Sequence, residues 1–284
     1  MYSTLITATE LHRHLHDPQF VIVDCRFDLT NPNAGRAAYH AGHIPGAVYA
    51  HLDDDLSGPL TAHSGRHPLP DARILADTFG RWNIDDSKQV IAYDANTGAM
   101  AAARLWWLLR WLGHPHVAVL NGGLMHWQAA GFELTSSVFT PAPGKFKGMP
   151  QASWISTADE VARCVQQKDW RVIDARAPER YAGSVEPIDA VAGHIPGARN
   201  YPLNRNLHAD GQWLPAATLR TQFSELLGDS APTHVISMCG SGVTACHNLL
   251  ALEVAGLPGA KLYPGSWSEW IKDGTRPIKT DPTP

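Results

Sequence analysis

The sequence lacks the features that mark several broad classes of protein. It contains only four cysteines in 284 residues, none of them in a Cys-x-x-Cys pair. That is too few for the disulfide framework of a small secreted protein and favours a reducing compartment. There is no basic tract, and the net charge is -4. We therefore expect neither a nucleic acid nor an anionic membrane as a partner.

Long apolar segments are also missing. No window of about 18 uninterrupted apolar residues occurs, so no membrane-spanning helix is predicted. The first ten residues, Met1 to Glu10, have neither the basic region nor the apolar region of a secretion signal. We expect a soluble, cytoplasmic protein.

Histidine is abundant, with 15 residues, but it does not form a recognisable metal motif. Neither His-Glu-x-x-His nor a compact cluster of cysteine and histidine is present. The groups around His12 and His114 lie beside polar or proline-containing turns. Surface histidines are the expected explanation, and the sequence predicts no metal and no organic cofactor.

Two motifs occur twice in the chain. Val21-Ile-Val-Asp-Cys-Arg26 recurs as Arg171-Val-Ile-Asp-Ala-Arg176, and Gly42-His-Ile-Pro-Gly-Ala47 recurs as Gly193-His-Ile-Pro-Gly-Ala198. Such a repeat indicates two homologous halves. In each half, short apolar strands alternate with helical patterns, which is typical of an α/β domain whose parallel sheet is flanked by helices.

The segment between the halves has the composition of a linker. Residues 140–150 contain three prolines and two glycines and show no periodicity. We predict a first domain at residues 1–140, a linker at residues 141–150 and a second domain at residues 151–284.

The second half carries the most informative local pattern. Val235 to Met238 form an apolar run, which predicts a buried strand. Cys239 follows directly, then a glycine-rich turn, then a helical pattern from about Val243 to Ala255. Cys239 is therefore expected at the mouth of a helix.

That position favours a thiolate over a thiol. Unpaired amides and the positive end of the helix dipole gather there. Because Gly240 and Gly242 leave the backbone free to curl, the amides up to Val243 and Thr244 could converge on one sulfur. The alternative is that Cys239 is a small buried residue at a strand end, as most free cysteines are.

The loop Cys239-Gly-Ser-Gly-Val-Thr244 resembles the active-site loop of the rhodanese superfamily, and within it that of the 3-mercaptopyruvate sulfurtransferases. The resemblance extends over nearly the whole chain, through the two repeats, Leu105-Trp-Trp-Leu-Leu-Arg110 and Gly265-Ser-Trp-Ser-Glu-Trp270. It implies tandem rhodanese-like domains and a cysteine that carries sulfur as a persulfide. At the equivalent position the first half has Asp94, so that half is expected to be non-catalytic.

The resemblance also implies roles for other residues. Arg180, in Glu179-Arg-Tyr-Ala-Gly183, matches the arginine that binds the sulfur donor in the family. Ser241, His67 and Asp54 match, with decreasing closeness, a serine, a histidine and an aspartate to which acid–base work has been attributed. The alternative for Arg180 is a surface arginine, and for the other three residues a solvated loop position.

The choice of donor is open to two interpretations. Asp189 stands where 3-mercaptopyruvate-specific members usually have a second arginine. However, Gly240 and Ser241 replace the cationic residues of thiosulfate-specific loops. We expect transfer from 3-mercaptopyruvate to a thiol such as thioredoxin or glutathione, or to cyanide, with thiosulfate as the alternative donor. A phosphatase of the same fold would need an arginine at Ala245, and a non-catalytic sulfur-sensing or scaffolding module is a third possibility.

Overall fold

A computed structural model describes residues 1–95, 97–98 and 101–281. The chain forms two compact units. The first unit contains Met1–Gly58, Leu69–Gln151 and Leu207–Trp213, and the second contains Pro59–Pro68, Ala152–Asn206 and Leu214–Pro284. The predicted boundaries at residues 140 and 150 follow the sequence alone and stay a prediction.

The first unit is built on a five-stranded sheet in which every pair of neighbours is parallel, in the order β1-β5-β4-β2-β3. Its strands are β1 (Leu5–Ile6), β2 (Phe20–Asp24), β3 (Val48–Tyr49), β4 (Gln89–Tyr93) and β5 (Val117–Leu120). Its helices are α1 (Ala8–Arg13), α2 (Ala34–Ala41), α3 (Ala72–Arg81), α4 (Ala101–Trp111) and α5 (Gly123–Ala129). The strands β2 and β4 are buried almost throughout, as expected for a sheet covered on both faces.

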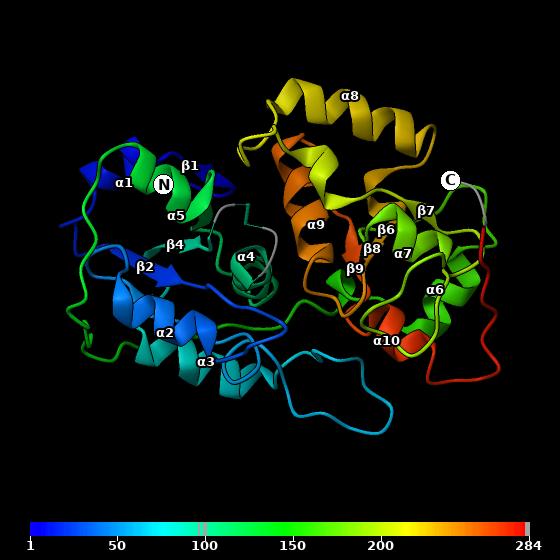
Figure 1. Cartoon of the computed structure of the whole chain (residues 1–284), viewed down its shortest axis with the longest axis horizontal. Helices are drawn as coiled ribbons and strands as arrows, with labels where there is room; N and C mark the ends of the chain where they lie inside the picture. Colours follow the sequence, from blue (N-terminus) through cyan, green and yellow to red (C-terminus); the bar gives the residue numbers. More distant parts are fainter. Residues whose placement is uncertain (96, 99–100, 282–284) are drawn as a thin grey trace. The chain divides into compact units, whose positions relative to one another are not determined.

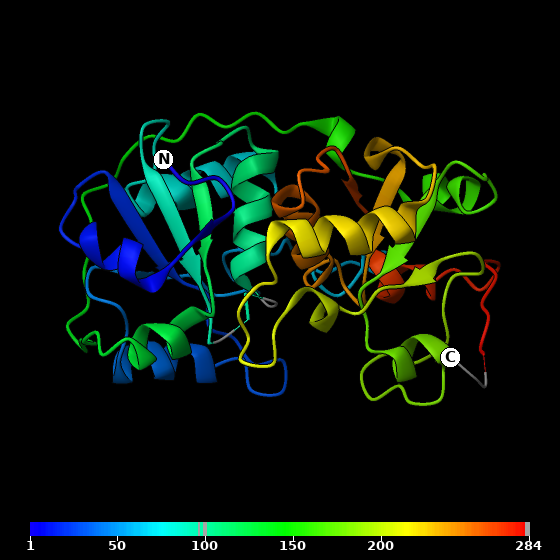
Figure 2. The ribbon, with the colours of Figure 1, turned by 90° about the horizontal axis from the view of Figure 1, so that it is seen from above.

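Helices cover both faces of this first sheet. One apolar cluster joins Leu11 of α1, Tyr39 of α2 and Trp127 of α5 to Ile22 and Ile91 of the strands. The long apolar helix α4 packs against β4 and β5. Figure 2 shows α4 on the opposite side of the strands from α1 and α5. The predicted parallel sheet flanked by helices is therefore confirmed for this unit.

The second unit repeats the plan with a four-stranded parallel sheet, in the order β7-β6-β8-β9. Its strands are β6 (Arg171–Asp174), β7 (Arg199–Asn200), β8 (Val235–Met238) and β9 (Lys261–Leu262). Its α-helices are α6 (Ala158–Cys164), α7 (Pro178–Ala182), α8 (Ala216–Leu227), α9 (Ala245–Val254) and α10 (Ser266–Trp270). Its 3-10 helices are η1 (Ala152–Trp154), η2 (Leu203–Asn206) and η3 (Pro232–His234).

This second sheet is also covered on both faces. Val161 of α6 and Trp267 and Trp270 of α10 form an apolar cluster with Ile236 and Met238 of β8. Helices α8 and α9 pack against one another. Figure 1 shows them on the other side of the strands from α6 and α10. The fold class predicted for the second half is confirmed as well.

Within the described ranges, no helix is both long enough and apolar enough to cross a membrane.

Candidate active site

Cys239 follows the last residue of β8, which lies between β6 and β9 in the second sheet. Helix α9 begins at Ala245, two residues after the predicted Val243. The residues between them form a loop at the carboxyl end of a central parallel strand. Open α/β sheets bind their ligands at this edge.

The start of α10 holds this loop in place through three hydrogen bonds. The amide of Cys239 donates to Ser266 Oγ over 3.1 Å. The amides of Trp267 and Ser268 donate to the carbonyls of Cys239 and Gly240 over 3.0 and 2.9 Å. Ser266 itself has φ +52°, a costly conformation for a residue with a side chain. The Gly265–Trp270 motif therefore fixes the position of the cysteine loop.

The backbone requires glycine at position 242, and Gly240 lies beside two arginine side chains. Gly242 has φ +77°, and a Cβ there would lie 2.3 Å from the carbonyl oxygen of Pro264. A Cβ on Gly240 would lie 3.1 Å from Nη2 of Arg66 and 3.5 Å from Nη2 of Arg180. Two guanidinium groups thus lie beside the residue that follows Cys239.

Several amides of the loop remain available to a ligand. Within the described part of the chain, the amides of Gly240, Ser241, Val243 and Thr244 donate no hydrogen bond. Unpaired buried amides are rare in folded proteins unless a ligand or water uses them. A run of them around a cysteine forms a nest suited to an anion.

Cys239 differs from the other three cysteines in its surroundings, although all four are free and buried. Burial raises the pKa of the Cys25 thiol well above its usual value and also raises that of Cys164. The Cys246 thiol donates to the carbonyl of Gly242 over 3.4 Å, behind the loop. None of these three cysteines lies in the run of unpaired amides that follows Cys239, and their predicted inertness stays a prediction.

Ser241 and His67 are in direct contact although 174 positions separate them. Nδ1 of His67 lies 2.7 Å from Oγ of Ser241, and both residues are about 95% buried, with exposures of 4% and 5%. A histidine and a hydroxyl at this distance can share a proton. The structure therefore brings together two of the predicted acid–base residues.

The segment that carries His67 is bound tightly to the second unit. The amide of Arg66 donates to Ser268 Oγ over 2.9 Å. At Gly65 the backbones approach so closely that a Cβ would lie 2.4 Å from the carbonyl oxygen of Gly265. Lys272 Nζ donates to the carbonyl of Thr61. These contacts to α10 and its neighbours explain why residues 59–68 belong to the second unit.

Arg180 lies in α7 and is bound to two acidic side chains. Its Nε and Nη2 donate to Glu186, and Nη2 also donates to Oδ2 of Asp189 over 2.9 Å. The other oxygen of Asp189 accepts from Nη1 of Arg66. Asp189 therefore bridges the two arginines that flank Gly240. Sequence reasoning did not identify Arg66, and the only local signal was its place beside His67.

A further ion pair is connected to Arg180 through Glu186. Arg176 pairs with Asp174 over 2.7 Å and contacts Glu186 over 3.4 Å. Burial opposes ionisation of Glu186, but hydrogen bonds from Arg180 and from two backbone amides outweigh it and lower the Glu186 pKa. The carboxylate of Glu186 therefore forms an ion pair with the Arg180 guanidinium over 2.8 Å.

Asp54 belongs to the first unit. Its side chain is 68% exposed and lies 3.4 Å from Nδ1 of His51 and 3.6 Å from Nη2 of Arg36. The predicted role of Asp54 beside His67 stays a prediction.

The loop after β4 in the first unit has a carboxylate where the second has a thiol. Asp94 follows the last residue of β4, and its Oδ1 accepts from the amide of Gly98 over 2.8 Å. A cavity of about 220 Å³ is lined here by Arg26, Asp28 and Asp94 among others. The expected absence of a thiol at this site follows from the sequence itself.

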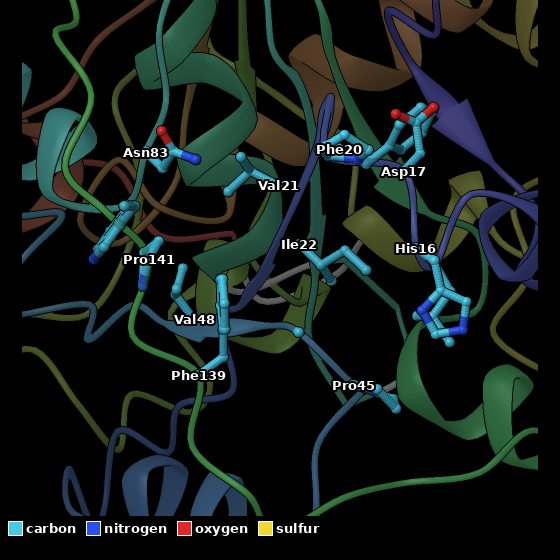
Figure 3. Close-up of a pocket in the computed structure, with 14 residues that line it drawn as sticks. His16, Asp17, Phe20, Val21, Ile22, Pro45, Val48, Asn83, Phe139 and Pro141 are labelled. Atoms are coloured by element: carbon cyan, nitrogen blue, oxygen red, sulfur yellow. The ribbon is translucent and has the colours of Figure 1, made fainter.

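A second cavity of the first unit, of about 270 Å³, lies at the opposite edge of the sheet. Figure 3 shows Phe139, Pro141 and Val48 grouped on one side of it and His16 and Asp17 on another. It opens beside the first residues of β2 and β3, which is not the edge where α/β sheets bind substrates.

Across the described residues, no three histidine, cysteine or acidic side chains are grouped as metal ligands.

Comparison with known proteins gives a consistent result. The model of the rhodanese-like domain matches residues 7–130 and again residues 157–273. A Pseudomonas aeruginosa protein named "Probable 3-mercaptopyruvate sulfurtransferase" is 47% identical over 278 residues, which cover 97% of this chain and 98% of that protein.

A Mycobacterium tuberculosis protein named "Putative thiosulfate sulfurtransferase SseB" is 40% identical, over 96% of each chain. Among solved structures, the 3-mercaptopyruvate sulfurtransferase from Leishmania major matches with a TM-score of 0.82 and 32% identity. That match covers 94% of this chain and 74% of the Leishmania chain.

Proposed function

This chain belongs to the rhodanese-like sulfurtransferases, with two such domains, and we propose that it transfers sulfane sulfur from 3-mercaptopyruvate through a persulfide on Cys239. The observation that carries the proposal is that, in the described chain, the amides of Gly240, Ser241, Val243 and Thr244 donate no hydrogen bond. Such a nest stabilises both the attacking thiolate and the persulfide anion.

In the first half-reaction, the Cys239 thiolate attacks the sulfur of 3-mercaptopyruvate. A sulfur–sulfur bond forms, and the carbon–sulfur bond of the donor breaks, leaving its electron pair on carbon as the enolate of pyruvate. One proton converts this enolate to pyruvate. In the second half-reaction, a thiol such as thioredoxin or glutathione, or cyanide, removes the outer sulfur and regenerates the thiolate.

The pair of Ser241 and His67 supplies or relays the proton in this scheme. The 2.7 Å contact between Oγ and Nδ1 supports that role because proton transfer needs hydrogen-bond distance. Asp54 is proposed as the third acid–base residue. Since Asp54 is exposed and already contacts His51 and Arg36, Asp54→Asn is the most direct check of that part.

Arg180 binds the donor carboxylate, and Arg66 acts beside it. Nη2 of Arg66 and Nη1 of Arg180 donate no hydrogen bond within the described residues. Two guanidinium groups next to Gly240 match the planar, bidentate geometry of a carboxylate. In this proposal the first domain is non-catalytic, because Asp94 stands in place of the nucleophile.

Thiosulfate is the second candidate donor. The missing second arginine, at the position of Asp189, weakens the case for 3-mercaptopyruvate, and the name of the mycobacterial relative supports thiosulfate. Parallel steady-state assays of one preparation with both donors, and with cyanide and a thiol as acceptors, test the proposal. We expect kcat/KM to be higher with 3-mercaptopyruvate by about tenfold or more. Higher kcat/KM with thiosulfate would assign the enzyme to the second candidate.

A further inference from the structure

We propose that Asp189 is a positioning residue that holds Arg66 and Arg180 as a pair beside Gly240 and restricts the site to donors with a single negative charge. The inference rests on the proposed function and adds to it the residue that selects among donors. It concerns the position at which this sequence departs from the pattern of its family.

The geometry around Asp189 is that of a buried bridge. The side chain of Asp189 is 3% exposed, and each of its oxygens accepts from a different guanidinium, Oδ1 from Arg66 and Oδ2 from Arg180. Its amide donates to Glu186 over 3.0 Å, which fixes the backbone. Arg66 comes from residues 59–68 and Arg180 from α7, and among the described residues only Asp189 accepts hydrogen bonds from both side chains.

The bridge places both arginines at the cysteine loop. The position that a Cβ on Gly240 would occupy is 3.1 Å from Arg66, 3.5 Å from Arg180 and 3.6 Å from Asp189. A donor bound to the loop amides would therefore meet two cations and one carboxylate together. An arginine at position 189 would instead add a third positive charge here.

The charges of the connected group balance. Arg66, Arg176 and Arg180 are joined by hydrogen bonds or ion pairs to Asp174, Glu186 and Asp189, three cations to three anions. A neutral group can hold a singly charged carboxylate through the two remaining guanidinium nitrogens. A dianion such as thiosulfate would leave one further charge uncompensated in a poorly hydrated site.

Substitution of Asp189 by asparagine tests this charge selection. Asp189→Asn keeps the shape of the side chain and removes one negative charge. We expect kcat/KM for thiosulfate, relative to 3-mercaptopyruvate, to rise by roughly tenfold, the size of one charge-assisted contact. Asp189→Glu keeps the charge and is expected to retain the native preference. Arg163→Ala, an exposed arginine of α6, is the matched control and should change neither value.

Binding measurements separate this inference from the proposed function. Calorimetric titration with sulfate and with pyruvate, which need no turnover, gives the ratio of the two dissociation constants for native protein and Asp189→Asn. We expect the variant to shift this ratio toward sulfate by roughly tenfold. An unchanged ratio in a variant with a native Tm, or a rise with Asp189→Glu as well, overturns the inference. Absence of turnover with either donor in the native protein would instead refute the proposed function.

Discussion

The loop after β4 in the first unit and the loop after β8 in the second unit accept the same pair of backbone hydrogen bonds. They differ in the side chain that follows the strand, which is Asp94 in the first unit and Cys239 in the second. In the first unit, the amides of Leu124 and Met125 donate to the carbonyls of Asp94 and Ala95, each over 2.9 Å. In the second unit, Trp267 and Ser268 make the corresponding two bonds to Cys239 and Gly240, over 3.0 and 2.9 Å.

The two loops differ in the hydrogen-bond acceptors of their backbone amides. In the first unit the carboxylate of Asp94 accepts from the amide of Gly98, so the loop already contains its own anion. In the second unit Cys239 leaves neighbouring amides without a partner in the described chain. The same fold therefore supports either a loop whose own carboxylate accepts from a loop amide or one that can bind an external anion.

The largest expected effect comes from exchanging these two side chains. Cys239→Ser should abolish turnover, because a hydroxyl at neutral pH neither ionises nor carries sulfane sulfur. Asp94→Cys in the Cys239→Ser background should not restore it, since the sequence has Asn96 where the second unit has Ser241. Steady-state assays with both donors measure the outcome, and activity in the double variant would break the comparison.

Substitution of the acid–base pair is expected to have the next largest effect. His67→Ala should lower kcat on the order of a hundredfold, the lower end of the usual contribution of a general acid or base. Ser241→Ala should cost nearly as much, and the double variant little more than either, because the two residues act through one hydrogen bond.

The control for this pair is His43, a buried histidine of the first unit whose Nδ1 bonds to the carbonyl of Tyr39 over 2.7 Å. His43→Gln should lower Tm without lowering kcat of the protein that remains folded. Fully additive losses in the double variant of Ser241 and His67 would argue against a shared role.

Removal of Arg180 should have a smaller effect, located in donor binding. We expect Arg180→Ala to reduce kcat/KM by at least about tenfold, or about 1.4 kcal/mol, mostly through KM. Unchanged kinetics with both donors would show that Arg180 serves only to hold Glu186 and Asp189. The control is an exposed arginine of α1 in the first unit: Arg13→Ala should leave both kinetic constants unchanged.

The smallest expected effect concerns the first helix of each unit. Thr7 and Thr157 cap α1 and α6, but only Glu10 completes a capping box, whereas Glu160 pairs with Lys261. Thr7→Ala should therefore lower the free energy of unfolding by about 1 kcal/mol, and Thr157→Ala by somewhat less.

This capping difference has a pH dependence. Hydrogen bonds from Thr7 lower the pKa of Glu10. Because the folded pKa is the lower one, the contribution of Glu10 is present above the unfolded value of about 4.3 and is lost as pH falls through the folded pKa. Thermal unfolding at neutral pH and at low pH measures it. A Thr7→Ala penalty that grows as pH falls would contradict this account.

Local sequence patterns predicted the repeat, the parallel sheets and the position of Cys239. Those features depend on residues close together in the chain, such as the apolar run of β8 and the glycines that follow it. The helix after the loop begins at Ala245 rather than Val243, and Gly242 has φ +77°, outside the range of a right-handed helix.

Contacts between distant residues could not be predicted from patterns. Ser241 and His67 were paired only through the family resemblance, since 174 positions separate them. The bridge from Arg66 to Asp189 spans 123 positions and had no sequence signal. From the sequence, Asp189 could be interpreted only as the absence of an arginine that related proteins have. Its partner Arg66 lies in a distant segment of the chain, so the sequence did not reveal the bridge.

The central claim is that Cys239 alone carries the transferred sulfur. Intact mass spectrometry after treatment with 3-mercaptopyruvate and removal of excess donor, followed by peptide mapping, tests it most directly. We predict one added sulfur per chain, located on the peptide that contains Cys239, and none on Cys239→Ser. Added sulfur on Cys25, Cys164 or Cys246 with Cys239 unmodified would contradict the assignment.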